Sequence, residues 1–152
     1  MAYSDDSLDL ESLIYRSSAV CEMSPVALYG LLTKARANNH ITQITGVLLY
    51  ADGEFFQVLE GTREKLDTVI DRIHCDGRHH NINLIHRAPI AVRNFPEWRM
   101  GFLACKEMCG RISDLTRDPQ ATHDGLGEAV FSSLRQYFAP AGEQALSEKV
   151  ST

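Results

Sequence analysis

The 152-residue sequence lacks the features that mark several large classes of protein. It has no apolar run long enough to cross a bilayer, and its acidic, polar amino end (MAYSDDSLDLES) is unlike a signal or transit peptide. Fifteen Lys and Arg against twenty Asp and Glu give a formal charge of −5, whereas nucleic-acid binding needs clustered basic groups. We therefore expect a cytoplasmic protein that binds no membrane and does not bind nucleic acid directly.

Motifs for metals and for common enzymes are also missing. The four cysteines show no CxxC spacing, so we expect free thiols rather than disulfides: Cys21, Cys75, Cys105 and Cys109. The adjacent His79 and His80 would point in different directions on a helix or a strand, which does not suit two ligands of one metal. No GxSxG or Walker motif occurs. The sequence thus predicts no metal site, no catalytic residues and no enzyme activity.

The composition instead fits one globular domain, with 44% hydrophobic and 23% charged residues. Residues 12–20 alternate like a strand, and Ser24-Pro25 is typical of a helix start. That helix is expected to end at Asn38-Asn39. Two apolar runs, ITGVLLY and EFFQVLEG, flank Asp52-Gly53 and predict a β-hairpin.

The rest of the chain completes a recognisable order of elements. Thr62 is expected to cap a second helix that closes at Asp76-Gly77, and residues 83–92 and 98–105 are expected to form two more strands. The order βαββαββ predicts an α+β, ferredoxin-like antiparallel sheet with both helices on one face.

The carboxyl-terminal part predicts a helix rather than another strand. After Asp124-Gly125, one helical stripe carries five residues: Leu126, Val130, Leu134, Tyr137 and Phe138. The sheet face opposite the two helices would carry Ile14, Phe56 and Val58, which need a cover. We expect the tail helix, or a partner, to provide it. The expected division is an extension over 1–11, a folded domain over 12–106 and a helical tail over 107–152.

Polar residues fall where a plain sheet core would have apolar ones. Tyr15 shares a strand face with Leu13, and Gln57 lies between Phe55 and Leu59. Buried phenol and carboxamide groups must bond each other or a polar ligand, because an unpaired one costs about 1–3 kcal/mol. With an Asn at the rim, they could line a flat heteroaromatic ligand.

Ordinary explanations of the same residues remain open at this point. Tyr15 could be a core tyrosine with its hydroxyl at the edge, and Asn39 could be a helix C-cap. Gln57 could face solvent if the strand were shifted by one residue, because such a slip exchanges the two faces of a sheet.

Beyond these patterns, the sequence resembles the BLUF family, sensors of blue light using FAD. The resemblance covers about two thirds of the chain, from Leu13 to roughly Cys105. It is carried by LIYRSSA at 13–19, ARANNHITQITGVLLYADGEFFQVLEG at 35–61, IDRIHCDGRHHNI at 70–82 and NFPEWRMGF at 94–102. Ala35 departs from the family pattern, in which many members have Ser.

The resemblance implies a role for each matching residue. Tyr15 would be the photoactive tyrosine and Gln57 the glutamine that switches its hydrogen bonds, while Trp98 and Met100 on the last strand would take part in signalling. Nine residues would bind the cofactor: Leu31, Asn38, Asn39, Ile44, Arg72, Ile73, Asp76, Arg78 and His79.

The resemblance also implies a function and a cofactor. FAD would be bound non-covalently, with FMN or riboflavin as substitutes. Light would drive electron and proton transfer from Tyr15, rearrange the hydrogen bonds of Gln57 and shift the flavin absorption to the red. The chain resembles short members without a catalytic output domain, which act on a separate protein partner, often as homo-oligomers.

Three rival functions predict different properties of the protein. A ferredoxin-like regulatory module that binds a small metabolite without photochemistry would be colourless, whereas a flavin sensor would be yellow. A flavin-dependent enzyme would need a substrate opening, for which no motif is present. A pure interaction domain is compatible with the sensor, because a sensor without an enzyme must pass its signal by contact.

Overall fold

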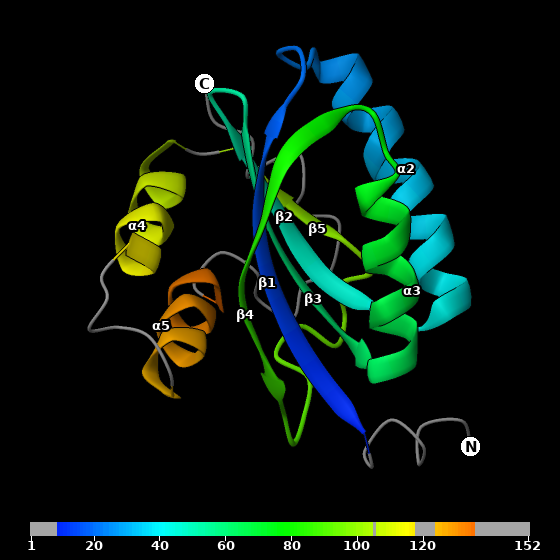
Figure 1. The fold of residues 1–152 in the computed structure, drawn as a ribbon, viewed down its shortest axis with the longest axis vertical. Helices are drawn as coiled ribbons and strands as arrows, with labels where there is room; N and C mark the ends of the chain where they lie inside the picture. The colour runs from blue at the N-terminus through cyan, green and yellow to red at the C-terminus, as the bar shows by residue number, and fades with distance from the viewer. Residues whose placement is uncertain (1–8, 105, 118–123, 136–152) are drawn as a thin grey trace.

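The computed structural model describes residues 9–104, 106–117 and 124–135, in which a single sheet lies between two pairs of helices (Figure 1). The described elements, in chain order, are β1 (Leu10–Ala19), α2 (Pro25–Thr42), β2 (Thr45–Ala51), β3 (Glu54–Thr62), α3 (Arg63–His74), β4 (His79–Pro89), β5 (Gly101–Leu103), α4 (Lys106–Arg117) and α5 (Asp124–Arg135).

The five strands lie in the order β4-β1-β3-β2-β5. The first three neighbouring pairs are antiparallel, whereas β2 and β5 pair in parallel, so the expectation of a wholly antiparallel sheet was wrong at this edge. The chain reaches β5 through a long crossing segment rather than a hairpin, and a crossover of this kind permits the parallel direction. The ferredoxin-like α+β fold itself is confirmed.

The β2–β3 hairpin forms where Asp52-Gly53 predicted it. Both turn residues have positive φ, 52° for Asp52 and 77° for Gly53, which is the conformation that a two-residue hairpin turn requires. The turn sets the register, so that Leu48 lies opposite Gln57 and Tyr50 opposite Phe55.

Helix α2 begins as predicted and ends later than predicted. The Ser24 hydroxyl accepts a hydrogen bond from Ala27 N at 3.1 Å, and Pro25 is the first helical residue. The helix then continues past Asn38 and Asn39 and ends at Thr42, followed by the C-cap residue Gln43, which has left-handed φ. Asn39 is buried inside the helix, and its tertiary contacts outweigh its weak helix propensity. It is therefore not a C-cap.

The ends of the last two strands also differ from the predictions. Strand β4 covers 79–89 rather than 83–92, because β1 offers backbone partners as far as Ala19, which pairs with His79. Strand β5 covers only 101–103, since Trp98 lies in a turn in which its N–H donates to Phe95 O at 3.2 Å. Trp98 and Met100 therefore precede the last strand instead of lying on it.

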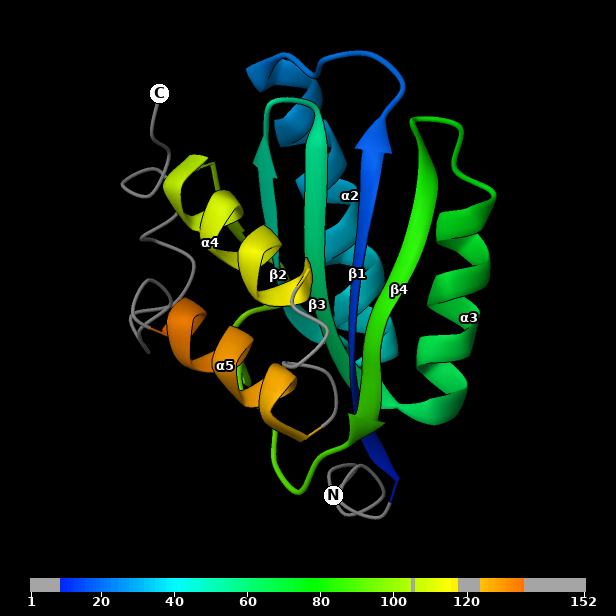
Figure 2. The same ribbon diagram turned by 60° about the vertical axis from the view of Figure 1, so that its left-hand side comes forward.

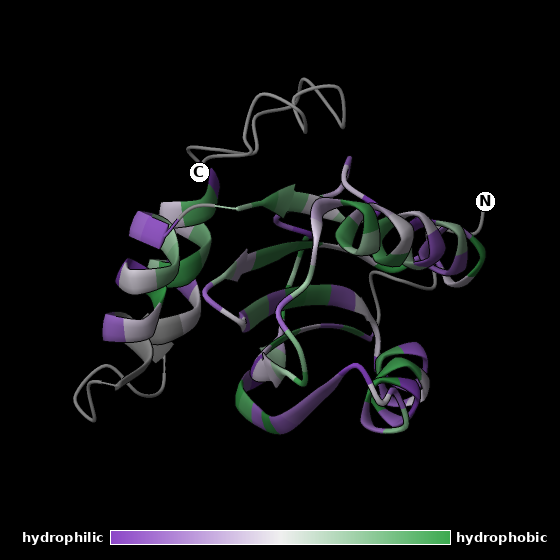
Figure 3. Cartoon of the chain, turned by 90° about the horizontal axis from the view of Figure 1, so that it is seen from above, coloured by the Kyte–Doolittle hydropathy of each residue, from purple (hydrophilic) through white to green (hydrophobic). Residues whose placement is uncertain are grey.

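The period-2 pattern assigns the two sheet faces correctly. Seen from above, α2 and α3 cover one face and α4 and α5 the other (Figure 3). The apolar side chains of the two faces form two separate buried clusters. Leu13, Tyr15 and Phe55 belong to the cluster under α2 and α3, while Ile14 and Phe56 belong to the opposite cluster. Gln57 thus points toward α2 and α3, and the solvent-facing alternative is excluded.

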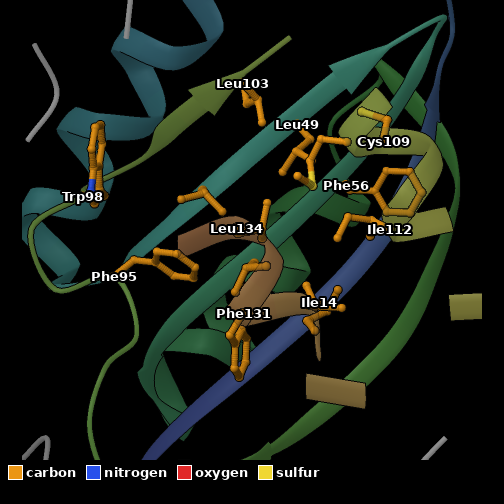
Figure 4. Close-up of a cluster of buried hydrophobic side chains, with 14 residues drawn as sticks. Ile14, Leu49, Phe56, Phe95, Trp98, Leu103, Cys109, Ile112, Phe131 and Leu134 are labelled. Carbon is orange, nitrogen blue, oxygen red and sulfur yellow. The ribbon is translucent and has the colours of Figure 1, made fainter. Parts of the chain in front are cut away.

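The expected cover of the second face is provided by two helices, α4 and α5, which lie side by side over the strands (Figure 2). Figure 4 shows the apolar cluster between them and the sheet. Its members from the helices are Met108, Cys109, Ile112, Val130, Phe131 and Leu134. The sequence analysis placed residues 107–152 in a helical tail but did not single out α4 as a separate helix, although the buried residues of α4 follow helical spacing. The predicted stripe residues Tyr137 and Phe138 and the Leu126 side chain lie outside the described residues.

Candidate functional site

The centre of the site is a hydrogen-bonded tyrosine–glutamine pair on adjacent strands. Tyr15 of β1 and Gln57 of β3 are directly opposite in the antiparallel register, and their side chains point to the same face. The Tyr15 hydroxyl donates to Gln57 Oε1. The two residues are 3% and 8% exposed, respectively. Because strand pairing fixes both backbones, the phenol and the amide are held together without help from a loop.

Burial governs the proton of this pair. Removal from water raises the pKa of Tyr15 well above its ordinary value of 10.0, and the negative charge of Asp76 raises it further. The phenol therefore keeps its proton at neutral pH and remains the donor toward the Gln57 oxygen.

The other end of the Gln57 amide contacts Met100. Gln57 Nε2 lies 3.2 Å from Met100 Sδ, and a thioether is a weak acceptor that cannot donate. The Tyr15 hydroxyl could pair with either end of a carboxamide, because it both donates and accepts. The Met100 sulfur can accept a hydrogen bond from the amide nitrogen but can donate none to the amide oxygen. It therefore favours the present orientation of the Gln57 amide, with Nε2 toward Met100.

Helix α2 brings asparagine side chains to the same space. Asn39 Nδ2 donates to Arg99 O at 2.6 Å, while Asn39 Oδ1 has no hydrogen-bond partner among the described residues. Asn38 likewise makes no side-chain hydrogen bond within the described part of the chain. These amide atoms are available to a ligand with donors and acceptors along one edge.

The end of α3 and the following loop form another side of the site. Arg78 binds Asp76 through its side chain, with Nη2 2.7 Å from Oδ2, and this hydrogen bond is the main reason that the pKa of Asp76 is lowered to about 2. His79 Nε2 lies 3.0 Å from Ile73 O, so this nitrogen carries the hydrogen. His79 Nδ1 lies 2.8 Å from the Ser17 hydroxyl.

These groups surround a cavity of about 500 Å³, within the range of roughly 300–1,000 Å³ usual for small-molecule sites. Its lining includes Tyr15, Gln57 and Met100 together with eight of the predicted cofactor-binding residues: Leu31, Asn38, Asn39, Arg72, Ile73, Asp76, Arg78 and His79. Their contact with a cofactor stays a prediction.

Two predicted residues lie away from this cavity. Ile44 is fully buried in the core, and its N–H donates to Asn39 O at 3.0 Å, so it supports the end of α2 instead of lining the space. Trp98 is 2% exposed and belongs to the cluster under α4 and α5 (Figure 4). Trp98 and Met100 are therefore on opposite faces of the sheet.

Some lining residues were missed by the sequence analysis. Lys34 and Phe55 line the cavity, and Ser17 holds His79 through its hydroxyl. Ser17 could have been found from strand alternation, since it shares a face with Tyr15. Lys34 lies one helical turn from Leu31 and Asn38, which was the available signal.

Other kinds of site find no support in the described residues. Within residues 9–104, 106–117 and 124–135, no group of three or more His, Cys, Asp or Glu could hold a metal ion. None of the helices described there combines the length and apolarity that crossing a membrane would take.

Comparison with known proteins identifies the kind of site. A family model described as sensors of blue-light using FAD matches residues 10–101. Photoactivated adenylate cyclase subunit beta of Euglena longa is 37% identical over 92 residues, covering 60% of this chain and 11% of that protein. The blue light- and temperature-regulated antirepressor BluF of Escherichia coli K12 is 34% identical over 73 residues, which is 18% of its length.

Solved structures agree over more of the chain. The dark-state structure of BlrB, a BLUF protein, matches with a TM-score of 0.69 and 32% identity over 84% of this chain and 96% of that one. The photo-activated BlsA matches with the same TM-score and 27% identity over 82% and 94%. A bacterial light-regulated adenylyl cyclase matches over 93% of this chain but only 41% of its own.

The curated relatives are thus much longer than the matched region, whereas BlrB and BlsA are nearly covered. The Tyr15–Gln57 pair, the cavity beneath α2 and α3 and the family match all concern the same part of the chain. The resemblance found in the sequence is confirmed, and the cofactor of the family is FAD. This chain belongs to the BLUF family, the sensors of blue light using FAD.

Proposed function

We propose that this chain is a blue-light photoreceptor that binds FAD non-covalently and signals to a separate protein. The observation that carries the proposal is the buried hydrogen bond between Tyr15 and Gln57 in the lining of the cavity. The proposed division is a sensor over 12–106 and a tail over 107–152. The sensor itself carries out no catalysis on a substrate.

The residues present fit a flavin dinucleotide. Leu31 of α2 and Ile73 of α3 offer apolar walls for a flat ring system, and Asn38 and Asn39 offer amide groups for its polar edge. At the same cavity, Lys34 and Arg72 make no ion pair with a described residue and suit the charge of a diphosphate. Riboflavin would retain the first set of contacts and lose the second, whereas FMN would keep one phosphate for the basic side chains.

The side chains of this chain then have distinct tasks. A bound flavin supplies absorption of blue light and, when excited, a strong electron acceptor. Tyr15 would give up an electron to the excited flavin, which makes its hydroxyl acidic, and the proton at Oη would move along the hydrogen bond to Gln57 Oε1 while the amide gives up a proton from Nε2 toward the flavin. The electron and a proton would then return to Tyr15, so that no net oxidation remains. The Gln57 amide is left rotated or tautomerised and presents a changed set of donors and acceptors to the cavity.

The energies involved are small, but the Tyr15–Gln57 pair is buried. A neutral hydrogen bond contributes about 1 kcal/mol, and a buried amide must find new partners for every one that it loses. Since Met100 Sδ accepts the Gln57 nitrogen and cannot donate to the oxygen, a turned amide loses that contact. We infer that Met100 and the residues before it then shift, which passes the change toward Trp98 and the tail.

The recipient is proposed to be a protein partner, with the chain acting as a homo-oligomer. The tail helices lie on the sheet face away from the cavity, where they could present a changed surface without exposing the cofactor. Direct binding of nucleic acid or of a membrane is no part of the proposal.

An absorption spectrum before and after blue light tests the proposal. The purified protein, supplied with FAD, should be yellow, should shift its visible bands to the red on illumination and should return in the dark. Protein that stays colourless after reconstitution, or yellow protein whose spectrum does not shift, would show that the proposal is wrong.

A further inference from the structure

Glu60 is a buried carboxylate that the flavin chemistry does not use. It lies on β3 three residues after Gln57 and is 0% exposed. Oε2 accepts hydrogen bonds from Asn94 N at 2.6 Å and Asn94 Nδ2 at 3.0 Å, while Oε1 accepts from Phe95 N at 2.9 Å and Thr45 Oγ1 at 3.2 Å. Three of these four donors belong to the segment that leads from β4 to β5.

The Asn94 side chain links Glu60 of the sheet to Arg135 of α5. While its Nδ2 donates to Glu60, its Oδ1 accepts from Arg135 Nη1 at 2.7 Å. Arg135 is the last residue of α5 and also pairs with Glu128 at 2.6 Å. The Asn94 carboxamide therefore bridges β3, which carries Gln57, and the end of α5.

The segment after this bridge returns to the cavity. Within residues 93–100, Phe95 contacts Phe131 of α5, with ring centroids 6.4 Å apart, and Trp98 O accepts from Gly46 N at 2.9 Å. At the far end, Arg99 O is held by Asn39 and Met100 Sδ by Gln57. The 93–100 segment is thus attached to Glu60 at one end and to the cavity at the other.

A segment fixed at only one end would absorb a displacement by local rearrangement. A segment fixed at both ends transmits the displacement. The 93–100 segment does so because the turn at residues 95–98 is packed and hydrogen-bonded and has few other arrangements. Burial of the Glu60 carboxylate makes this attachment specific, since removing the acceptor breaks the hydrogen bonds that the backbone N–H groups of Asn94 and Phe95 donate to it.

We propose that Glu60 is a positioning residue of the light response, which through Asn94 couples the 93–100 segment and α5 to the strand that carries Gln57. The inference rests on the proposed photoreceptor function. It assigns to Glu60 no contact with flavin and no part in the Tyr15 proton transfer.

The test combines visible absorption with hydrogen–deuterium exchange of the FAD-loaded full chain, in the dark and under blue light. In the wild-type protein we expect the red shift together with a light-induced change in exchange at residues 94–100 and 127–134. Glu60→Gln keeps one acceptor oxygen and replaces the other with an NH2 group that cannot accept. It should keep the red shift, should expose to exchange in the dark the amide of residue 94 or 95 that faces the new NH2 group, and should reduce the light-induced change in α5 by roughly fivefold.

Glu11→Gln is the matched control. Glu11 is a buried carboxylate on neighbouring β1, paired with Arg63 at 3.1 Å and Arg87 at 2.7 Å and without contact to residues 93–100. The Glu11→Gln substitution should lower the free energy of unfolding and leave the light response of α5 unchanged. A reduced response in this control equal to that of Glu60→Gln would mean general loosening and would overturn the proposal.

The outcomes separate this inference from the function on which it rests. No red shift in the wild-type protein would refute both. A red shift with no change in α5, or an undiminished α5 response in Glu60→Gln, would refute the coupling alone. If Glu60→Gln fails to fold, Asn94→Ala decides, because it keeps the backbone bonds and removes the bridge: its α5 response should fall by about twofold, and an unchanged one overturns the proposal.

Discussion

The two faces of the sheet use the same strands for opposite purposes. The face under α4 and α5 is filled by apolar side chains such as Phe56, Trp98 and Phe131 (Figure 4). The face under α2 and α3 has a similar apolar base but keeps a cavity of about 500 Å³ and the buried polar groups of Tyr15 and Gln57. The first face provides packing energy, and the second gives up some packing to hold a ligand.

The contrast teaches how a sensor can respond without unfolding. Buried polar groups re-pair when their partners change, whereas a close-packed apolar cluster resists partial displacement. A small rearrangement of hydrogen bonds on the cavity face can therefore displace the packed layer on the other face as a unit, without unfolding it. The 93–100 segment, with Met100 on one face and Trp98 on the other, connects the two.

The largest effect should come from Gln57→Leu, which removes both polar functions of the amide and nearly keeps its shape. FAD content should stay close to that of the wild type, and the red shift should disappear, because no hydrogen bond can be exchanged. Absorption spectra with and without blue light measure this. Normal photocycling in the variant would contradict the role given to Gln57.

Tyr15→Phe should also stop the normal photocycle, because the ring remains and the transferable proton does not. The Gln57 oxygen loses its donor, which should lower the free energy of unfolding by about 1–3 kcal/mol. Tyr50→Phe is the matched control: Tyr50 is buried on the same face, outside the cavity lining, and its hydroxyl accepts from Met23 N at 2.9 Å. The control should photocycle normally.

A pair of phenylalanine substitutions tests the division between the faces directly. Phe131→Ala should lower the free energy of unfolding by about 3–5 kcal/mol and leave the dark flavin spectrum unchanged. Phe55→Ala, at a cavity-lining residue of equal size, should lower both stability and flavin retention. Chemical denaturation and flavin content measure the two effects. Equal flavin loss in both variants would mean that the faces are not independent.

Asn39→Ala should weaken flavin retention more than Gln57→Leu or Tyr15→Phe does. It removes an amide that lines the cavity and also frees Arg99 O, whose hydrogen bond from Asn39 Nδ2 measures 2.6 Å. The rate of FAD loss on gel filtration or dilution gives the comparison. Asn83→Ala, at an exposed residue of β4, is the control and should retain FAD like the wild type.

The smallest effect concerns the loop beside the cavity. Because folding lowers the pKa of Asp76 from 3.8 to about 2, its pairing with Arg78 stabilises the fold above pH 3.8, and this contribution is lost as the pH falls through about 2. The partly exposed pair should contribute only a fraction of about 1 kcal/mol. Stabilities of the wild type and Asp76→Asn should differ at pH 5 and converge near pH 2.

Asp71→Asn provides the comparison for this titration. Asp71 is an exposed residue of α3 and makes no ion pair with the described residues. Its substitution should leave the wild-type pH dependence of stability unchanged. A convergence in this variant like that of Asp76→Asn would assign the effect to overall charge instead of the Arg78 pair.

Local patterns in the sequence were sufficient for much of the fold and of the candidate site. Alternation on β1 and β3 assigned Tyr15 and Gln57 to one face, and Asp52-Gly53 set the hairpin, because strand period and turn conformation depend on neighbouring residues alone. The quoted motifs were sufficient to recognise the family. Family motifs also suggested Ile44 as a cofactor contact, whereas the structure places it in the core.

Only the tertiary structure decided where several elements end and what they contact. Asn38 and Asn39 read as helix breakers in isolation, but the bond from Asn39 to Arg99 O keeps them helical. The parallel pairing of β5, the separation of Trp98 from Met100 and the burial of Glu60 against Asn94 depend on residues more than thirty positions apart. No local pattern encodes such contacts, since they exist only when the packed sheet brings distant segments together.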